Sequence, residues 1–188
     1  AGASLTAAAV RNSNMIAYYL PSNLGGLTGE FQVGAGENAA NQNKSMAARL
    51  GYSAGPVMVT ASYGTFKKDK AMVDDLKTVN FGGTFNAGFA IFGALFEKSK
   101  YSTLEQKLTT VNLRVPVGAG LIKAQYTKAS GKGPAATPDQ YTAKSFGLGY
   151  VHNLSKRTAL YGTWARVSNS GGATTALNGS STAANATA

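Results

Sequence analysis

The amino-acid sequence predicts an all-β fold, and three observations lead to this prediction. Apolar and polar residues alternate with a period of two along most of the 188 residues, as side chains do on the two faces of a strand. The chain contains 23 glycines, 9 tyrosines and 8 phenylalanines, and glycine interrupts helices whereas aromatic residues favour pleated sheets. The connections between alternating segments are short and long in turn. Together these patterns favour an antiparallel meander.

Ten segments carry the alternation, and we expect each to be a strand. Few of them have the i, i+3, i+4 spacing of an amphipathic helix, and no apolar run approaches the roughly 20 residues of a membrane-spanning helix. In chain order the expected strands are 12–20, 27–35, 44–53, 57–66, 77–86, 89–98, 108–116, 121–127, 141–152 and 158–167.

Every second connection is short, so all the short turns should lie at one end of the sheet. The short connections are 21–26, 53–56, 86–88, 117–120 and 153–157. The longer, polar ones are 36–44, 67–76, 98–107, 128–140 and the tail from 168 onward. Such asymmetry is typical of antiparallel β-barrels that cross a bacterial outer membrane, which have short periplasmic turns and long external loops. Strands of about 9–11 residues also have the length that a tilted membrane-crossing strand needs.

The two parities of the strands differ in chemistry. We expect one parity to face lipid, and its representatives are Val57, Val59, Phe81, Val111, Leu113, Val115, Ile122 and Tyr126. The other parity should face a water-filled lumen, and it contains Glu30, Gln32, Arg49, Asn112, Arg114, Lys123 and Gln125. A soluble sandwich would alternate as well, but here the mid-strand polar face is modest and heavier charge lies in the connections.

Aromatic residues gather toward the ends of the expected strands. They are Tyr18, Tyr52, Phe66, Phe85, Phe89, Phe96, Tyr141, Tyr150 and Trp164. This placement resembles the aromatic girdles that membrane barrels carry at both interfaces. Ordinary core aromatics of a soluble protein are the alternative interpretation.

Charge and catalytic residue types narrow the function classes. Lys and Arg number 18 against 8 Asp and Glu, a formal net charge of +10, which suits nucleic acid, an anionic surface or small anions. The basic residues are scattered singly, which argues against nucleic acid. There is no cysteine and one histidine, His152, beside a turn. Asp74, Asp75, Glu97 and Glu105 are interpreted as charged loop residues, so we expect no enzyme, no metal site and no cofactor.

Two segments resemble a known family. "RNSNMIAYYLPSNLGGLTGEFQVGAGE", residues 11–37, and "FGLGYVHNLSKRTALYGTWARVSNSGG", residues 146–172, are similar to segments of Gram-negative porins, with the betaproteobacterial general porins as the nearest branch. The resemblance implies a homotrimer of sixteen-stranded outer-membrane barrels, each with a pore narrowed by an inward-folded third loop. In that pattern the ten strands would be the sixth to the fifteenth, and residues 1–10 the end of the constriction loop.

The resemblance implies a single porin domain over 1–188 that is incomplete at both ends; a self-contained ten-strand barrel is the alternative. It suggests that Arg11 and Arg166 join the pore wall, although Arg166 shares a parity with Leu160 and Trp164. It also implies outer-membrane lipid and lipopolysaccharide as partners.

The expected function is passive diffusion of ions and small hydrophilic solutes. An anion preference is expected because basic residues outnumber Glu30 on the polar parity. The main alternative is a secreted or surface β-sandwich that acts as an adhesin or binds a ligand. A nucleic-acid-binding β-domain is a further alternative; neither explains the alternating connections, and no nucleic-acid partner is expected.

Overall fold

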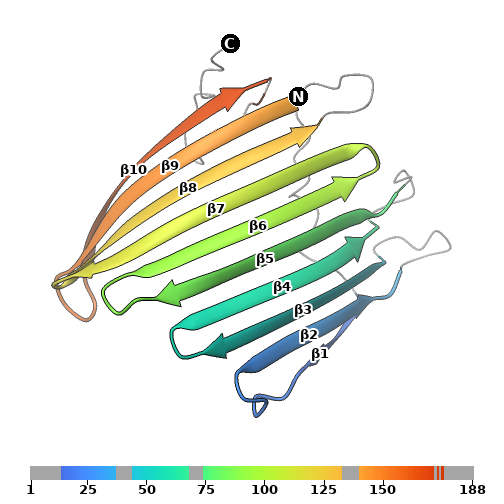
Figure 1. Cartoon of the computed structure of the whole chain (residues 1–188), viewed down its shortest axis with the longest axis horizontal. Helices are drawn as coiled ribbons and strands as arrows, with labels where there is room; N and C mark the ends of the chain where they lie inside the picture. The colour runs from blue at the N-terminus through green and yellow to red at the C-terminus, as the bar shows by residue number, and fades with distance from the viewer. Residues whose placement is uncertain are drawn as a thin grey trace.

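The computed structural model describes residues 14–36, 44–67, 74–132, 140–171, 173 and 175. They form one ten-stranded antiparallel sheet in which each strand pairs with the next along the chain (Figure 1). The strands are β1 (Met15–Tyr19), β2 (Leu27–Gly34), β3 (Ser45–Ala54), β4 (Val57–Phe66), β5 (Leu76–Asn86), β6 (Ile91–Tyr101), β7 (Leu104–Val117), β8 (Gly120–Lys132), β9 (Gln140–Asn153) and β10 (Ala159–Ser170). The ten strands expected from alternation are confirmed, in order. None of the described residues belongs to a helix that could cross a membrane.

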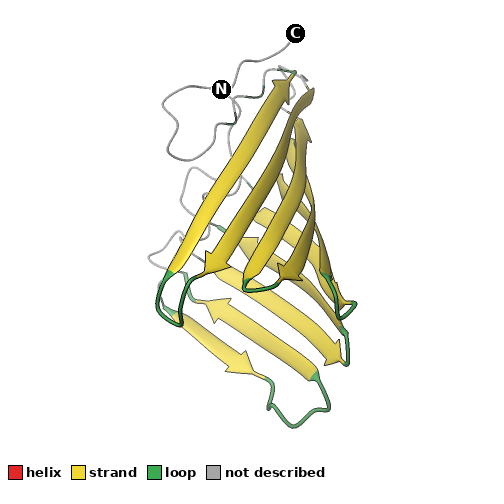
Figure 2. Cartoon of the chain, turned by 90° about the vertical axis from the view of Figure 1, so that its left-hand side faces the viewer, coloured by secondary structure: helices red, strands yellow, loops and turns green. Residues whose placement is uncertain are grey.

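The sheet is curled into a trough whose long edges are β1 and β10 (Figure 2). The connections β1–β2, β3–β4, β5–β6, β7–β8 and β9–β10 all lie at one end, which we call the short-turn end. Two of them, at 55–56 and 118–119, contain only two residues. The five connections predicted to be short therefore do lie together at one end.

The connection expected at 98–107 is the exception, and that expectation was wrong. β6 and β7 continue through this segment and are joined by the two residues 102 and 103, with Ser102 at a φ of 51°. Glu105 Oε2 lies 3.0 Å from Lys98 Nζ, and Glu105 Oε1 lies 3.2 Å from Lys107 Nζ. The hydrogen bond from Lys98 lowers the pKa of Glu105, which is the second residue of β7 and so lies at the end of that strand. The strongly polar composition suggested a loop, but the segment is a strand hairpin with one ion pair across the two strands and a second within β7.

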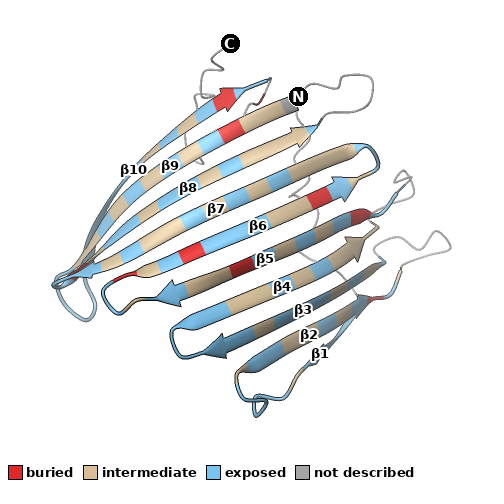
Figure 3. Ribbon diagram, in the orientation of Figure 1, coloured by how far each residue is buried: buried red, intermediate tan, exposed pale blue. Residues whose placement is uncertain are grey.

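The sheet is a single layer without a packed core. Among the described residues the buried apolar side chains are small or lie at element ends: Leu76, Ala90, Ala143 and Ala173. Along the strands, intermediate and exposed residues succeed one another with few buried positions (Figure 3). Large apolar side chains such as Ile16, Phe81 and Trp164 are 80%, 60% and 57% exposed. A β-sandwich would bury one face of each sheet against the other, so this architecture does not favour the sandwich alternative.

Two glycines in the turns of the short-turn end have left-handed backbones but different surroundings. Gly26 has a φ of +93°, and a Cβ built there would lie 2.1 Å from the carbonyl oxygen of Ser53. Its own carbonyl accepts a hydrogen bond of 2.9 Å from the Ser53 N–H. Gly55 has a φ of +53° and nothing within 4 Å of its Cβ position. The β1–β2 connection is thus locked onto β3, whereas the β3–β4 turn is open.

This difference predicts unequal costs for the same substitution. Gly55→Ala should lower the free energy of unfolding by about 1 kcal/mol, the strain of a left-handed residue with a Cβ. Gly26→Ala should cost roughly 2 kcal/mol more, because the Ser53 carbonyl must move away and the hydrogen bond from the Ser53 N–H to the Gly26 carbonyl weakens. Urea unfolding of the protein in lipid vesicles, followed by tryptophan fluorescence, measures both. Equal costs for the two variants would contradict the close approach at Gly26.

Candidate pore wall

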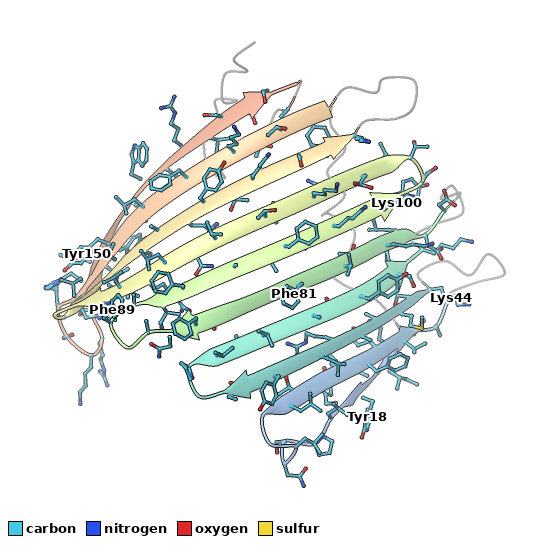
Figure 4. The ribbon with its side chains drawn as sticks, viewed as in Figure 1. Tyr18, Lys44, Phe81, Phe89, Lys100 and Tyr150 are labelled. Atoms are coloured by element: carbon cyan, nitrogen blue, oxygen red, sulfur yellow. The ribbon has the colours of Figure 1, made fainter. Side chains whose placement is uncertain are left out.

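Cross-strand pairing assigns every strand residue to one of two faces, because directly opposed residues point to the same side of a sheet. One such row runs from Tyr18 to Phe31, Ala48, Tyr63 and Val79. We call the face that contains this row the outer face and the opposite one the inner face. Two residues of the outer face, Tyr18 of β1 and Phe81 of β5, are labelled in Figure 4.

The inner face is the concave one. A hollow of about 670 Å³ is lined mostly by inner-face residues, and it joins Thr84 of β5 to Thr163 of β10. Strands five places apart can line one hollow only on the inside of a curved sheet. The outer face is therefore convex.

All eight residues expected to face lipid lie on the outer face. Phe81 pairs with Ala61 and Phe96, and Val111 pairs with Ala94 and Tyr126. The remaining members follow from the same register: Val57, Val59, Leu113, Val115 and Ile122. The register thus joins them into one continuous apolar surface on the convex side.

Seven residues expected to line a pore lie together on the inner face. They are Glu30, Gln32, Arg49, Asn112, Arg114, Lys123 and Gln125. Arg11, which was also expected to line the pore, lies outside the described residues. The seven form two separate groups, one on β2 and β3 and the other on β7 and β8.

The first group is electrically compensated. Glu30 and Arg49 are direct cross-strand partners, and Arg49 Nη2 lies 3.3 Å from Glu30 Oε2. The side-chain amide of Gln32 donates a hydrogen bond to Glu30 Oε1. These residues border a hollow of about 240 Å³ together with Ser62 and Thr78. Because the carboxylate and the guanidinium neutralise each other, this group adds little net field to the lumen.

The second group carries uncompensated positive charge. Arg114 and Lys123 are direct cross-strand partners, and both side chains are exposed. The next pair toward the long-connection end is Asn112 with Gln125, and Gln125 Nε2 donates to Thr127 Oγ1 at 3.3 Å. Like charges directly opposite each other are unfavourable. Within the described part of the chain no ion pair offsets Arg114 or Lys123, so they present two cations to the 670 Å³ hollow.

Sequence reasoning missed one inner-face carboxylate. Glu97, interpreted as a loop residue, lies in β6 opposite Asn80 and Leu108, and its Oε1 is 3.5 Å from Ser99 Oγ. Asn80 lies on the polar parity of β5, and Glu97 is its cross-strand partner. Recognising Glu97 as an inner-face residue therefore required the register of β5 against β6. Glu97 is six residues from the position opposite Arg114, about 20 Å along a strand, so it does not compensate that charge.

Neutral hydroxyl residues make up much of the remaining inner wall, and they too were not singled out. Thr110 Oγ1 and Thr127 Oγ1 lie 3.0 Å apart, and Thr78 Oγ1 lies 3.1 Å from Ser99 Oγ. Side chains that both donate and accept hydrogen bonds keep the wall wetted without adding charge.

Two expectations need correction. Arg166 does not lie with the other pore candidates: it pairs with Phe146 on the outer face, two residues from Trp164. The resemblance to the family implied a pore-lining Arg166. Residues two positions apart in a strand point to the same side, however, so Arg166 must share the outer face with Trp164. Phe66 and Tyr141, expected in the aromatic girdles, lie on the inner face, opposite Leu76 and Gly131.

A single-layer curled sheet that is apolar outside and polar inside is the wall of a membrane β-barrel. Comparison with known proteins agrees and is more specific: residues 1–172 match the family described as Gram-negative porin. The chain belongs to this family, which places it in the outer membrane of a Gram-negative bacterium.

Relatives of known structure and sequence support the assignment. The chain is 30% identical over 182 residues to outer membrane porin protein 32 of Delftia acidovorans, covering 89% of this chain and 50% of that protein. It superposes on an anion-selective porin from Comamonas acidovorans with a TM-score of 0.69 at 27% identity, covering 84% of this chain and 49% of the other. OmpT of Vibrio cholerae in its trimer form gives a TM-score of 0.67 at 13% identity, over 82% and 54% of the two chains. The chain thus spans about half the length of the curated relative.

The assignment of faces predicts a labelling pattern with a period of two. The sequence contains no cysteine, so single cysteines can be introduced without background. Lys123→Cys and Gln125→Cys should react with a membrane-impermeant thiol reagent in vesicles, because water reaches the inner face. Ile122→Cys and Ala124→Cys, on the same strand, should react at least about tenfold more slowly because lipid covers them. Equal reactivity at all four positions would contradict the two-faced wall.

Proposed function

We propose that this chain forms the wall of an outer-membrane porin, through which ions and small hydrophilic solutes diffuse passively. One observation carries the proposal: a continuous inner face of hydroxyl, amide and charged side chains on a sheet whose outer face is apolar. Lipid would cover the outer face and water would fill the inside. Solutes would diffuse through the water-filled lumen down their concentration gradients, a process that involves no catalytic step and no cofactor.

We propose further that the channel prefers anions. The inner face of the described strands carries three cations, Arg49, Arg114 and Lys123, and two carboxylates, Glu30 and Glu97. Arg49 is paired with Glu30, whereas Arg114 and Lys123 stand together near the short-turn end. Fixed positive charge at a lumen wall raises the local concentration of anions. The similarity to an anion-selective porin from Comamonas acidovorans supports the same preference.

The preference can be tested by reversing the two charges. In planar bilayers under a salt gradient, Arg114→Glu with Lys123→Glu should lower the anion-to-cation permeability ratio about threefold or more, since four units of charge change within a few ångströms of permeating ions. The reversal potential measures this ratio.

The chain offers a matched control on the neighbouring strand pair. Lys128 and Lys144 are also direct cross-strand partners, but they lie on the outer face of β8 and β9. Reversing them changes the net charge by the same amount and should leave the reversal potential unchanged. A channel with cation preference before any substitution would refute the anion proposal, and absence of conductance would refute the porin proposal.

We propose that the complete protein is a homotrimer surrounded by outer-membrane lipid and lipopolysaccharide. The trimer form named for OmpT of Vibrio cholerae, which has the same strand architecture, supports this assembly. The protein extracted in mild detergent should migrate as a trimer on unheated gels and as a monomer after boiling. Light scattering that gives the mass of a single chain would contradict it.

A further inference from the structure

Most of the positive charge carried by the strands lies outside the pore. The outer face of β5–β10 holds eight of the chain's 18 Lys and Arg residues and one carboxylate, Glu105. The eight are Lys77, Lys98, Lys100, Lys107, Lys128, Lys132, Lys144 and Arg166. All lie in the half of the sheet nearer the long connections, as Figure 4 illustrates for Lys100.

Two pairs of lysines oppose each other directly on this face, and they differ in how their repulsion is relieved. Lys98 faces Lys107, and the carboxylate of Glu105 lies between them at 3.0 Å and 3.2 Å. Lys128 faces Lys144 in the same way. No carboxylate of the described residues is paired with that second couple.

Arg166 adds a third cation to the Lys128–Lys144 pair. Lys144 pairs with Ser168, so Arg166 is its diagonal neighbour on β10. Cross-strand partners have Cβ atoms about 5 Å apart, and diagonal ones are within roughly 8 Å. All three side chains are exposed. These are three neighbouring cations on one face, and no carboxylate of the described strands forms an ion pair with them. Such a cluster suits a multivalent anion.

The three cations lie at the border of the apolar surface. The next outer-face pair toward the short-turn end is Tyr126 with Phe146, followed by Ala124 with Leu148. In the other direction the next pair is Ser130 with Thr142. The rings of Phe146 and Trp164 stand 6.0 Å apart below Arg166, and they are 42% and 57% exposed. The cations therefore sit where a hydrocarbon-facing surface gives way to a polar one.

We propose that Lys128, Lys144 and Arg166 bind the phosphate of a phosphorylated lipid in the outer leaflet. Arg166 offers the guanidinium fork that matches a phosphate, and the two lysines supply point charges. The acyl chains of the same lipid would lie on Phe146, Leu148 and Trp164. This site rests on the proposed function, because it requires the outer face to meet lipid and the long connections to lie outside.

Native mass spectrometry of the full-length protein in detergent tests the site. The probes are bisphosphorylated lipid A, the same lipid after dephosphorylation, and inorganic phosphate. The wild-type protein should retain bisphosphorylated lipid A through washing and lose the dephosphorylated form. The triple variant Lys128→Gln, Lys144→Gln and Arg166→Gln should bind lipid A about 100-fold more weakly, because each cation near an anionic headgroup contributes about a fivefold gain in binding.

A matched control removes the same charges elsewhere. Lys44→Gln, Lys156→Gln and Arg157→Gln also replace two lysines and one arginine, at exposed positions outside the strands, and should retain lipid A. Equal weakening in both triple variants would show a diffuse charge effect and overturn the site. Unchanged binding of lipid A by the triple variant at Lys128, Lys144 and Arg166 would also overturn the site. So would equal retention of dephosphorylated lipid A by the wild-type protein, or displacement of lipid A by millimolar inorganic phosphate.

Planar-bilayer conductance separates this inference from the proposed function. The triple variant at Lys128, Lys144 and Arg166 should keep wild-type conductance and ion selectivity, because the three side chains lie outside the lumen. If it does not fold, the wild-type preference for phosphorylated over dephosphorylated lipid still decides the proposal. A protein that conducts ions but shows no such preference refutes only the lipid site.

Discussion

Hydrogen bonding between neighbouring strands is the interaction on which the rest of this structure depends. A sheet of one layer has no core to hold it, and the described residues bury few apolar side chains. In lipid, an unpaired N–H or C=O group costs several kcal/mol, so each strand must be paired along its length. The continuous pairing from β1 to β10 satisfies this requirement for β2 to β9, each of which has a hydrogen-bonded neighbour on both sides. Side chains are then free to match two different surroundings, one on each face.

The separation of charge between the two faces follows from that freedom. The inner face holds few charges, and Glu30 and Arg49 neutralise each other. The outer face concentrates lysines toward the long connections, where Glu105 bridges Lys98 and Lys107. A net charge of +10 is therefore a poor guide to pore selectivity by itself. The proposed anion preference rests instead on Arg114 and Lys123, because both border the hollow and no carboxylate of the described residues forms an ion pair with either.

The two ends of the sheet also have distinct roles. At the short-turn end the chain reverses within a few residues, and Gly26 is packed against the Ser53 carbonyl. At the opposite end, strands such as β7 and β8, with 14 and 13 residues, exceed the roughly 9–11 residues that cross a bilayer. The polar extension of β7 carries Glu105 and Lys107, beside Lys98 of β6. Charged side chains in this part of a strand fit the proposed orientation in the membrane, in which headgroups and water rather than hydrocarbon surround them.

The sequence by itself determined the number of strands, their order, the end at which short turns gather and the parity of residues within each strand. These are local properties, since a period of two and a glycine-rich turn are written in neighbouring residues. Only the tertiary structure decided which parity of one strand shares a face with which parity of the next, because register depends on pairing between distant segments. For this reason Glu97, interpreted as a loop residue, could be assigned to the inner wall only from the register of β5 and β6. Arg166 is different, because its parity with Trp164 was already visible in the sequence and conflicted with the family pattern. The juxtaposition of Lys128, Lys144 and Arg166 was likewise beyond the sequence, since three strands must align to create it.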